Sequence, residues 1–273
     1  MKISIGKHEF TQVWDGVLYK NLSSYPNITP WELRTILEFM EYERAQGRAC
    51  EIECDESDVL EAIARAQNAP RQYLDMPRPK LLTECTACLH RGCVTEFVCH
   101  TASAENAVKI LQCGKLLSAV KARNLPAREL MKEARNAAGD PEDYFDYVML
   151  SWGNCQAGDR LVMERKLKRF PNEADLSVDY TPGVRFYFRY DVLATHPGRV
   201  FDGVLPMKIK DEIALDDWLY AVVIPESLMP TLKSHIPPQL RQRVIRIAHA
   251  GEDIWQWSQK VYRAIEEKGL PQA

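Results

Sequence analysis

The sequence has none of the short motifs that identify the commonest nucleotide-binding and hydrolytic enzymes. GxGxxG, GxxxxGK[ST], GxSxG and HExxH are all absent from its 273 residues. These motifs carry dinucleotide binding in a Rossmann unit, phosphate binding by a P-loop, nucleophilic hydrolysis and zinc proteolysis. None of these four mechanisms is therefore expected. The sequence also shows no internal repeat and no low-complexity tract.

An excess of charge and a long apolar run are missing as well. The formal net charge is -3, which argues against a uniformly basic nucleic-acid binder but allows a local basic groove. The first residues, MKISIGKHEF, lack the apolar run of a signal peptide, and no apolar stretch reaches membrane-spanning length. We therefore expect a soluble, cytoplasmic protein with no membrane partner.

Eight cysteines are present, and one group of them is clustered in CTACLHRGC. Cys85, Cys88, His90 and Cys93 begin with the CxxC spacing that lets two thiolates reach one zinc ion. No second CxxC or HxxxH pair accompanies them, so reduced thiols without a metal are the preferred interpretation. Whether the cluster binds metal stays open at this stage.

Composition is that of a globular protein, with 46% hydrophobic and 27% charged residues, and the length allows one large domain or two modest ones. Residues 1–80 are expected to form a helical N-terminal layer and linker. Its first helix is capped by Thr29, starts at Pro30 and stops at Gly47. Its second starts at a cap on Asp55 or Ser57. This layer is interpreted as a packing or interaction element without catalytic residues.

Residues 81–273 have the texture of an α+β domain. Four apolar segments predict buried strands, namely TEFVCHT, DYVMLSW, GVRFYFRYD and DWLYAVVIP. Helical periodicity predicts helices over 103–113, 126–137, 158–169 and the segment EDIWQWSQKVYRAIEEKG.

The end of the first of these strands carries polar groups suited to a ligand. His100 and Thr101 end the strand, Ser103 is the expected N-cap of the next helix, and Gly114 closes that helix. A strand that leads into a capped helix leaves free backbone N–H groups at the helix start. The structural alternative is a buried histidine satisfied by the backbone beside a threonine that caps the turn.

The pattern H-T-x-S-x-E-N-x-x-x-I-L-x-x-G-K-L-L-S resembles the first strand-helix unit of the ADP-ribosyltransferase superfamily. It is most similar to the RNA 2'-phosphotransferase and DNA-targeting DarT-like branches. Residues 184–188, VRFYF, resemble a later strand of that family, and Asp216-Asp217 stand before WLYAVVIP where the family has its acidic residue. The resemblance covers roughly residues 94–230. It implies a split mixed or antiparallel sheet of ADP-ribosyltransferase type.

The resemblance also implies an activity and a set of roles. The protein would be a transferase that uses NAD and acts on a nucleic-acid, protein or small-molecule acceptor. Asp217, Asp216 and His100 would be the catalytic residues. His100, Thr101 and Ser103 would bind NAD, and Tyr187 would stack on nicotinamide. Asp217 departs from the family, which usually has Glu there, and no basic cluster of the 2'-phosphotransferase kind is present. His100 and Asp217 are predicted to share one cleft.

The segment SWGNCQAGDR adds polar candidates directly after a strand. Asn154, Gln156, Asp159 and Arg160 lie in the kind of strand-end loop where ligands are usually held, and we expect Asn154, Gln156 and Arg160 to help bind NAD. The alternative is that Asp159 caps a helix and Arg160 lies on its surface.

Two other functions are kept open. GEDIWQWSQKVY resembles arginine-containing cyclodipeptide synthases, which take aminoacyl groups from tRNA, although Glu252-Asp253-Ile254-Trp255-Gln256 departs from their DDxxE-type motif at its first and last positions. That resemblance implies a tRNA partner. The third possibility is a binding module without catalysis. The expected partners are thus a small-molecule or nucleotide ligand, with tRNA or another nucleic acid as an alternative.

Overall fold

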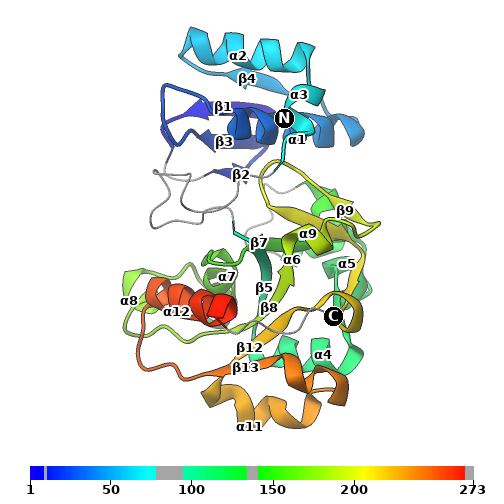
Figure 1. The fold of residues 1–273 in the computed structure, drawn as a ribbon, viewed down its shortest axis with the longest axis vertical. Coiled ribbons are helices and arrows are strands. Elements are labelled where there is room, and N and C mark those ends of the chain that lie inside the picture. Colours follow the sequence, from blue (N-terminus) through cyan, green and yellow to red (C-terminus); the bar gives the residue numbers. More distant parts are fainter. Residues whose placement is uncertain (9–10, 78–94, 134–140, 268–273) are drawn as a thin grey trace. The chain divides into compact units, whose positions relative to one another are not determined.

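The computed structural model describes residues 1–8, 11–77, 95–133 and 141–267, and the fold is mixed α+β. The chain divides into two compact units (Figure 1). The first comprises Met1–Leu89, Ser118–Val148 and Val200–Asp211, and the second comprises His90–Leu117, Met149–Arg199 and Glu212–Ala273. The predicted division into 1–80 and 81–273 is therefore incomplete, because two later segments belong to the first unit.

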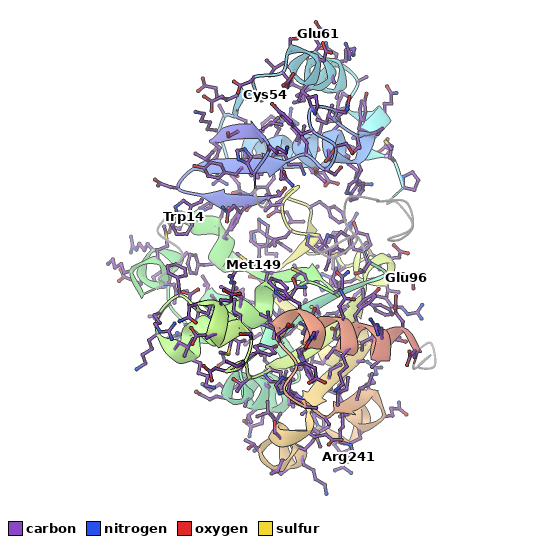
Figure 2. The ribbon with its side chains drawn as sticks, turned by 90° about the vertical axis from the view of Figure 1, so that its left-hand side faces the viewer. Trp14, Cys54, Glu61, Glu96, Met149 and Arg241 are labelled. Atoms are coloured by element: carbon purple, nitrogen blue, oxygen red, sulfur yellow. The ribbon has the colours of Figure 1, made fainter. Side chains whose placement is uncertain are left out.

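The first unit contains a sheet that the expected helical layer did not include. Its order is β2-β3-β1-β4, with β1 Lys2–Gly6, β2 Gln12–Trp14, β3 Val17–Asn21 and β4 Glu51–Glu53. β1 runs parallel to β3 and β4, and β2 is antiparallel to β3. The alternation of buried Ile3 and Ile5 with half-buried Lys2 and Ser4 is the period-2 pattern of a strand. Trp14, on the edge strand β2, is 44% exposed (Figure 2).

The helices of the first unit follow the expected boundaries. α1 spans Pro30–Ala45, and Thr29 and Glu32 form a capping box at its start. α2 spans Ser57–Asn68, but its N-cap is Glu56 without a side-chain cap, so the predicted caps at Asp55 and Ser57 are wrong. The short α3 is Arg71–Leu74. Both long helices pack on the sheet through the core residues Ile3, Ile5, Leu18, Leu33, Ile36, Phe39, Val59 and Ile63.

The two later segments of the first unit contribute α5 (Ala119–Arg123), α6 (Ala127–Glu133), the 3-10 helix η3 (Glu142–Asp146) and β10 (Met207–Lys210). They bring Lys208, which is fully buried, into a cage of tyrosine rings. Its Nζ lies 3.7 Å from the ring centre of Tyr42, 3.8 Å from that of Tyr144, and 3.0 Å from Oδ2 of Asp202. Burial lowers the pKa of Lys208, and Asp202 opposes that shift. The lysine thus ties three distant stretches of chain into one core.

The larger sheet has the order β13-β12-β8-β5-β7-β10-β9. Its strands are β5 Phe97–Ala102, β7 Tyr147–Trp152, β8 Val184–Arg189, β9 Arg199–Val200, β12 Ala221–Pro225 and β13 Val244–Ile247, besides β10. β8 is antiparallel to both β5 and β12, whereas β12 and β13 are parallel. β6 (Lys115–Leu117) and β11 (Glu212–Ala214) form a separate antiparallel pair. The four predicted strands are all confirmed.

One face of this sheet carries most of the second unit's core. Residues of β5, β8, β12 and β13 pack there against α7 (Ala157–Leu167), α8 (Glu173–Leu176) and α12 (Ile254–Glu267), including Cys99, Met163, Leu176, Tyr187, Val223, Trp257 and Val261 (Figure 1). The other short helices are α4 Ala104–Cys113, α9 Tyr190–Leu193, α10 Leu215–Trp218, α11 Met229–Leu232, and the 3-10 helices Glu226–Leu228, Lys233–His235 and Pro238–Arg243. In the described part of the chain, no helix combines the length and apolar character needed to cross a membrane.

Candidate functional site

His100 presents one ring nitrogen that no other described group occupies. It lies on β5 opposite Phe186 of β8, and its Nδ1 is 3.2 Å from the carbonyl oxygen of Met149 on β7 (Met149 is labelled in Figure 2). A carbonyl can only accept, so Nδ1 carries the hydrogen and Nε2 keeps a lone pair. Burial lowers the pKa of His100, and the nearby charge of Arg165 lowers it further. The hydrogen bond with Met149 opposes this shift. The ring is therefore a neutral hydrogen-bond acceptor at Nε2.

Thr101 does not accompany His100 on the same side of the sheet. Neighbouring strand residues point to opposite faces, and Thr101 lies opposite Arg185, whereas His100 lies opposite Phe186. The hydroxyl of Thr101 faces α7, since a Cβ placed on Gly158 would come within 2.5 Å of its Oγ1. Two residues that the sequence suggested as one grip are thus held on two faces.

Ser103 has the structural role that its place before the helix predicts. Its hydroxyl accepts a hydrogen bond from Asn106 N at 3.3 Å and caps α4. The helix ends at Gly114, whose φ of +69° is the left-handed conformation that glycine adopts without strain. The predicted strand, cap, helix and glycine stop are confirmed, while a contact of Ser103 with NAD stays a prediction.

Tyr187 is fully buried and its hydroxyl is occupied. The hydroxyl donates to the Gly153 carbonyl at 3.0 Å and accepts from Arg185 Nη1 at 3.1 Å. The ring packs in the core beside Cys99 and Trp257. The side chain therefore leaves no exposed ring face for the expected nicotinamide stacking, and its role here is packing.

Asp216 and Asp217 are exposed on α10, just before β12. Asp216 accepts a hydrogen bond from Gln239 Nε2 at 3.3 Å. The strand register places Val222 opposite Phe186, which in turn lies opposite His100. Val222 is thus level with His100 across the sheet, and Asp217 comes five positions before Val222 in the chain. The shared cleft of His100 and Asp217 stays a prediction.

Three of the predicted polar residues gather at the start of α7. Gln156 is the residue before the helix, and its Nε2 donates to the Asn154 carbonyl at 3.3 Å. Asn154 is buried, whereas Arg160, in the first turn, is exposed. Thr101 packs against Gly158 in the same turn, so candidates from two separate sequence segments meet here.

A buried ion pair beneath this turn was not foreseen from the sequence. Arg185 and Asp159 are both shielded from solvent, and Asp159 Oδ2 accepts from Arg185 Nε at 2.9 Å and Nη2 at 2.6 Å. Tyr180 donates to Oδ1 of Asp159 at 2.8 Å, and Arg185 Nη1 also donates to Ser258 Oγ at 3.2 Å. Burial opposes the charge on Arg185, but Asp159 more than offsets it and holds the pKa of Arg185 well above its ordinary value. Asp159 therefore lines no open pocket.

The acidic residues of the C-terminal segment are used locally. Glu252 accepts from Lys260 Nζ and from the Ala250 backbone at 2.7 Å, and despite the opposing effect of burial these donors lower the pKa of Glu252 to about 2. Asp253 accepts from Gln256 N at 2.7 Å at the start of α12. Asp253 thus caps the start of α12, whereas Glu252 is held by the Lys260 side chain and the Ala250 backbone. The cysteine cluster of Cys85, Cys88, His90 and Cys93 lies outside the described residues.

Comparison of the chain with known protein families, with curated proteins and with solved structures finds no match.

Proposed function

We propose that the second unit is a transferase of the ADP-ribosyltransferase type that takes its ADP-ribosyl group from NAD. The observation that carries this proposal is the adjacency of the three strands that bear the sequence resemblance. β5, β8 and the strand that follows Asp217, β12, are consecutive and antiparallel in the order β12-β8-β5. Segments more than a hundred residues apart in sequence are thus brought into one small part of the sheet, as a shared ligand site requires.

The residues present fit the donor in part. A neutral His100 with a free Nε2 can accept a hydrogen bond from a ribose hydroxyl, and its Nδ1 bond to Met149 holds the ring in one orientation. NAD supplies the ADP-ribosyl group when bound. Asp217 brings the exposed carboxylate that would stabilise positive charge developing on the ribosyl carbon. Tyr187 has no part in this scheme because it is buried.

The test is NAD binding by calorimetry together with nicotinamide release, in the wild type and in single variants. His100→Ala removes a ground-state contact and is expected to weaken NAD binding about fivefold to tenfold. Asp217→Asn keeps the shape and removes the charge, so turnover should fall about a hundredfold while binding changes much less. His235→Ala, in another part-buried histidine of the same unit, is the matched control.

Three results would contradict this proposal or one of its residue roles. Binding of NAD without nicotinamide release would make the unit a binding module. Aminoacyl transfer from arginyl-tRNA that is lost in Asp253→Asn would favour the cyclodipeptide synthase reading, although Asp253 caps α12 in this structure. Equal NAD binding in wild type and His100→Ala would remove His100 from the site.

A further inference from the structure

The first turn of α7 has backbone donors without acceptors. α7 is 11 residues long, and Gln156 before it does not cap it with its side chain. Arg160 N bonds to the Gln156 carbonyl and Ala157 N meets Cys155 Sγ at 3.4 Å. Within the described residues, no acceptor faces the N–H groups of Gly158 and Asp159. Free N–H groups at a helix start form a positive site that favours anions.

Two buried side chains beside this turn have a polar atom without a hydrogen-bond partner in the parts of the chain that the structure describes. Thr101 is 8% exposed and Asn154 is 3% exposed, and neither Oγ1 of Thr101 nor Oδ1 of Asn154 finds a hydrogen-bond partner among the described residues. Buried polar atoms are nearly always paired, so each unpaired one needs an explanation. Thr101 Oγ1 abuts Gly158, the second residue of α7, so its hydroxyl is directed at the same turn as the free N–H groups.

Charge at this turn suits a phosphate. The only carboxylate in it, Asp159, is turned inward, neutralised by Arg185 and hydrogen-bonded by the Tyr180 hydroxyl. Arg160 is exposed, and its guanidinium has no ion-pair partner in the described part of the chain. An incoming anion therefore meets an unpaired cation and no unpaired negative charge.

We propose that the first turn of α7 is a phosphate-binding site. The N–H groups of Gly158 and Asp159, the Thr101 hydroxyl and the Arg160 guanidinium are its donors. Gly158 is partly exposed, so the turn opens to solvent, and four donors match the several acceptor oxygens of a phosphate group. The site takes a free phosphate or the phosphate of a nucleotide; it rests on the proposed transferase function only if that nucleotide is NAD.

The experiment measures binding of inorganic phosphate, adenosine monophosphate and adenosine to the full chain by calorimetry at fixed ionic strength. Either phosphate-bearing probe should bind and adenosine should not. Arg160→Gln should weaken binding about tenfold, and Thr101→Val about fivefold, as loss of a charged and a neutral hydrogen bond predicts. Arg263→Gln, in another exposed arginine of the unit on α12, is the control and should leave binding unchanged.

Measurements of stability distinguish a role of Thr101 in phosphate binding from a purely structural role. Thr101→Val removes a buried hydroxyl that bonds to nothing, so its melting temperature should equal or exceed that of the wild type while phosphate binding falls. The proposal is overturned if neither phosphate nor adenosine monophosphate binds at millimolar concentration, or if Arg160→Gln and Arg263→Gln weaken binding equally. Neither outcome depends on NAD turnover, so this site can fail while the transferase proposal stands, and the reverse.

Discussion

Removal of one partner from the buried Arg185–Asp159 pair should greatly lower the free energy of unfolding of the second unit. Asp159→Leu takes away the acceptor of two charge-assisted hydrogen bonds and leaves a fully buried guanidinium with only the Tyr187 and Ser258 hydroxyls. Breaking a buried pair on one side costs about 3 to 5 kcal/mol, because the remaining charge is uncompensated. A domain is stabilised by only about 5 to 15 kcal/mol in total, so the loss is a large fraction.

The double variant decides whether that cost comes from the pair. Arg185→Met combined with Asp159→Leu replaces both charges by apolar side chains of similar size, and it should be at least about 2 kcal/mol more stable than Asp159→Leu alone. Urea denaturation followed by tryptophan fluorescence measures this, since Trp257 is fully buried in the same core. Glu105→Gln, which breaks the exposed pair of α4 with Lys109, is the control and should leave the midpoint unchanged.

The reasoning fails if Asp159→Leu costs less than about 1 kcal/mol, well below the range for a broken buried pair. It also fails if the free-energy losses of the two single variants simply add in the double variant. Additivity would mean that the two charges are independent, in spite of their 2.6 Å contact.

Three smaller predictions concern the first unit. Gly203→Ala should lower the free energy of unfolding by about 3 kcal/mol, since φ is +68° there and a Cβ would lie 1.8 Å from the Thr35 carbonyl; an unchanged urea midpoint would contradict this. Burial lowers the pKa of Lys20 from 10.5 to about 8, so between these pH values the unfolded chain binds more protons than the folded one. The free energy of unfolding should therefore rise with pH across this window, and the gain is lost as the pH falls through about 8. Lys20→Met should abolish this rise in denaturation curves that are compared with wild type. Thr29→Ala should cost about 1 kcal/mol in chemical denaturation through the lost cap on Glu32 N, and Thr29→Ser should restore most of it.

Local signals in the sequence were enough for the elements but not for their partners. The capping box of Thr29 and Glu32, and Ser103 and Gly114 at the ends of α4, act within one turn of helix, so their patterns predict the boundaries directly. Arg185 reads as one charge in an apolar strand, and nothing nearby indicates that its partner lies 26 residues before it. That pairing is a property of the fold.

In the candidate site, one feature could have been predicted from the sequence and another depends on the packing of the fold. The opposite directions of His100 and Thr101 follow from the period of two along any strand, and this could have been predicted from the sequence. The approach of Thr101 to Gly158 could not, because it depends on how α7 packs on β5. The burial of Tyr187 was likewise set by its neighbours Cys99 and Trp257, from two other parts of the chain.

The lysine cage of the first unit also dictates when this protein can fold as it is made. The ribosome releases Tyr42 early, Tyr144 about a hundred residues later and Lys208 later still, yet all three belong to one buried cluster. Chains generally fold domain by domain from the N-terminus during synthesis, at about 5 to 20 residues per second. The cage therefore cannot close until Lys208 has emerged, by which point β5, β7 and β8 of the second unit are already outside the ribosome. Nascent chains stalled before Lys208 should therefore form the core of residues 3–66 but leave the Tyr42 and Tyr144 rings open to solvent.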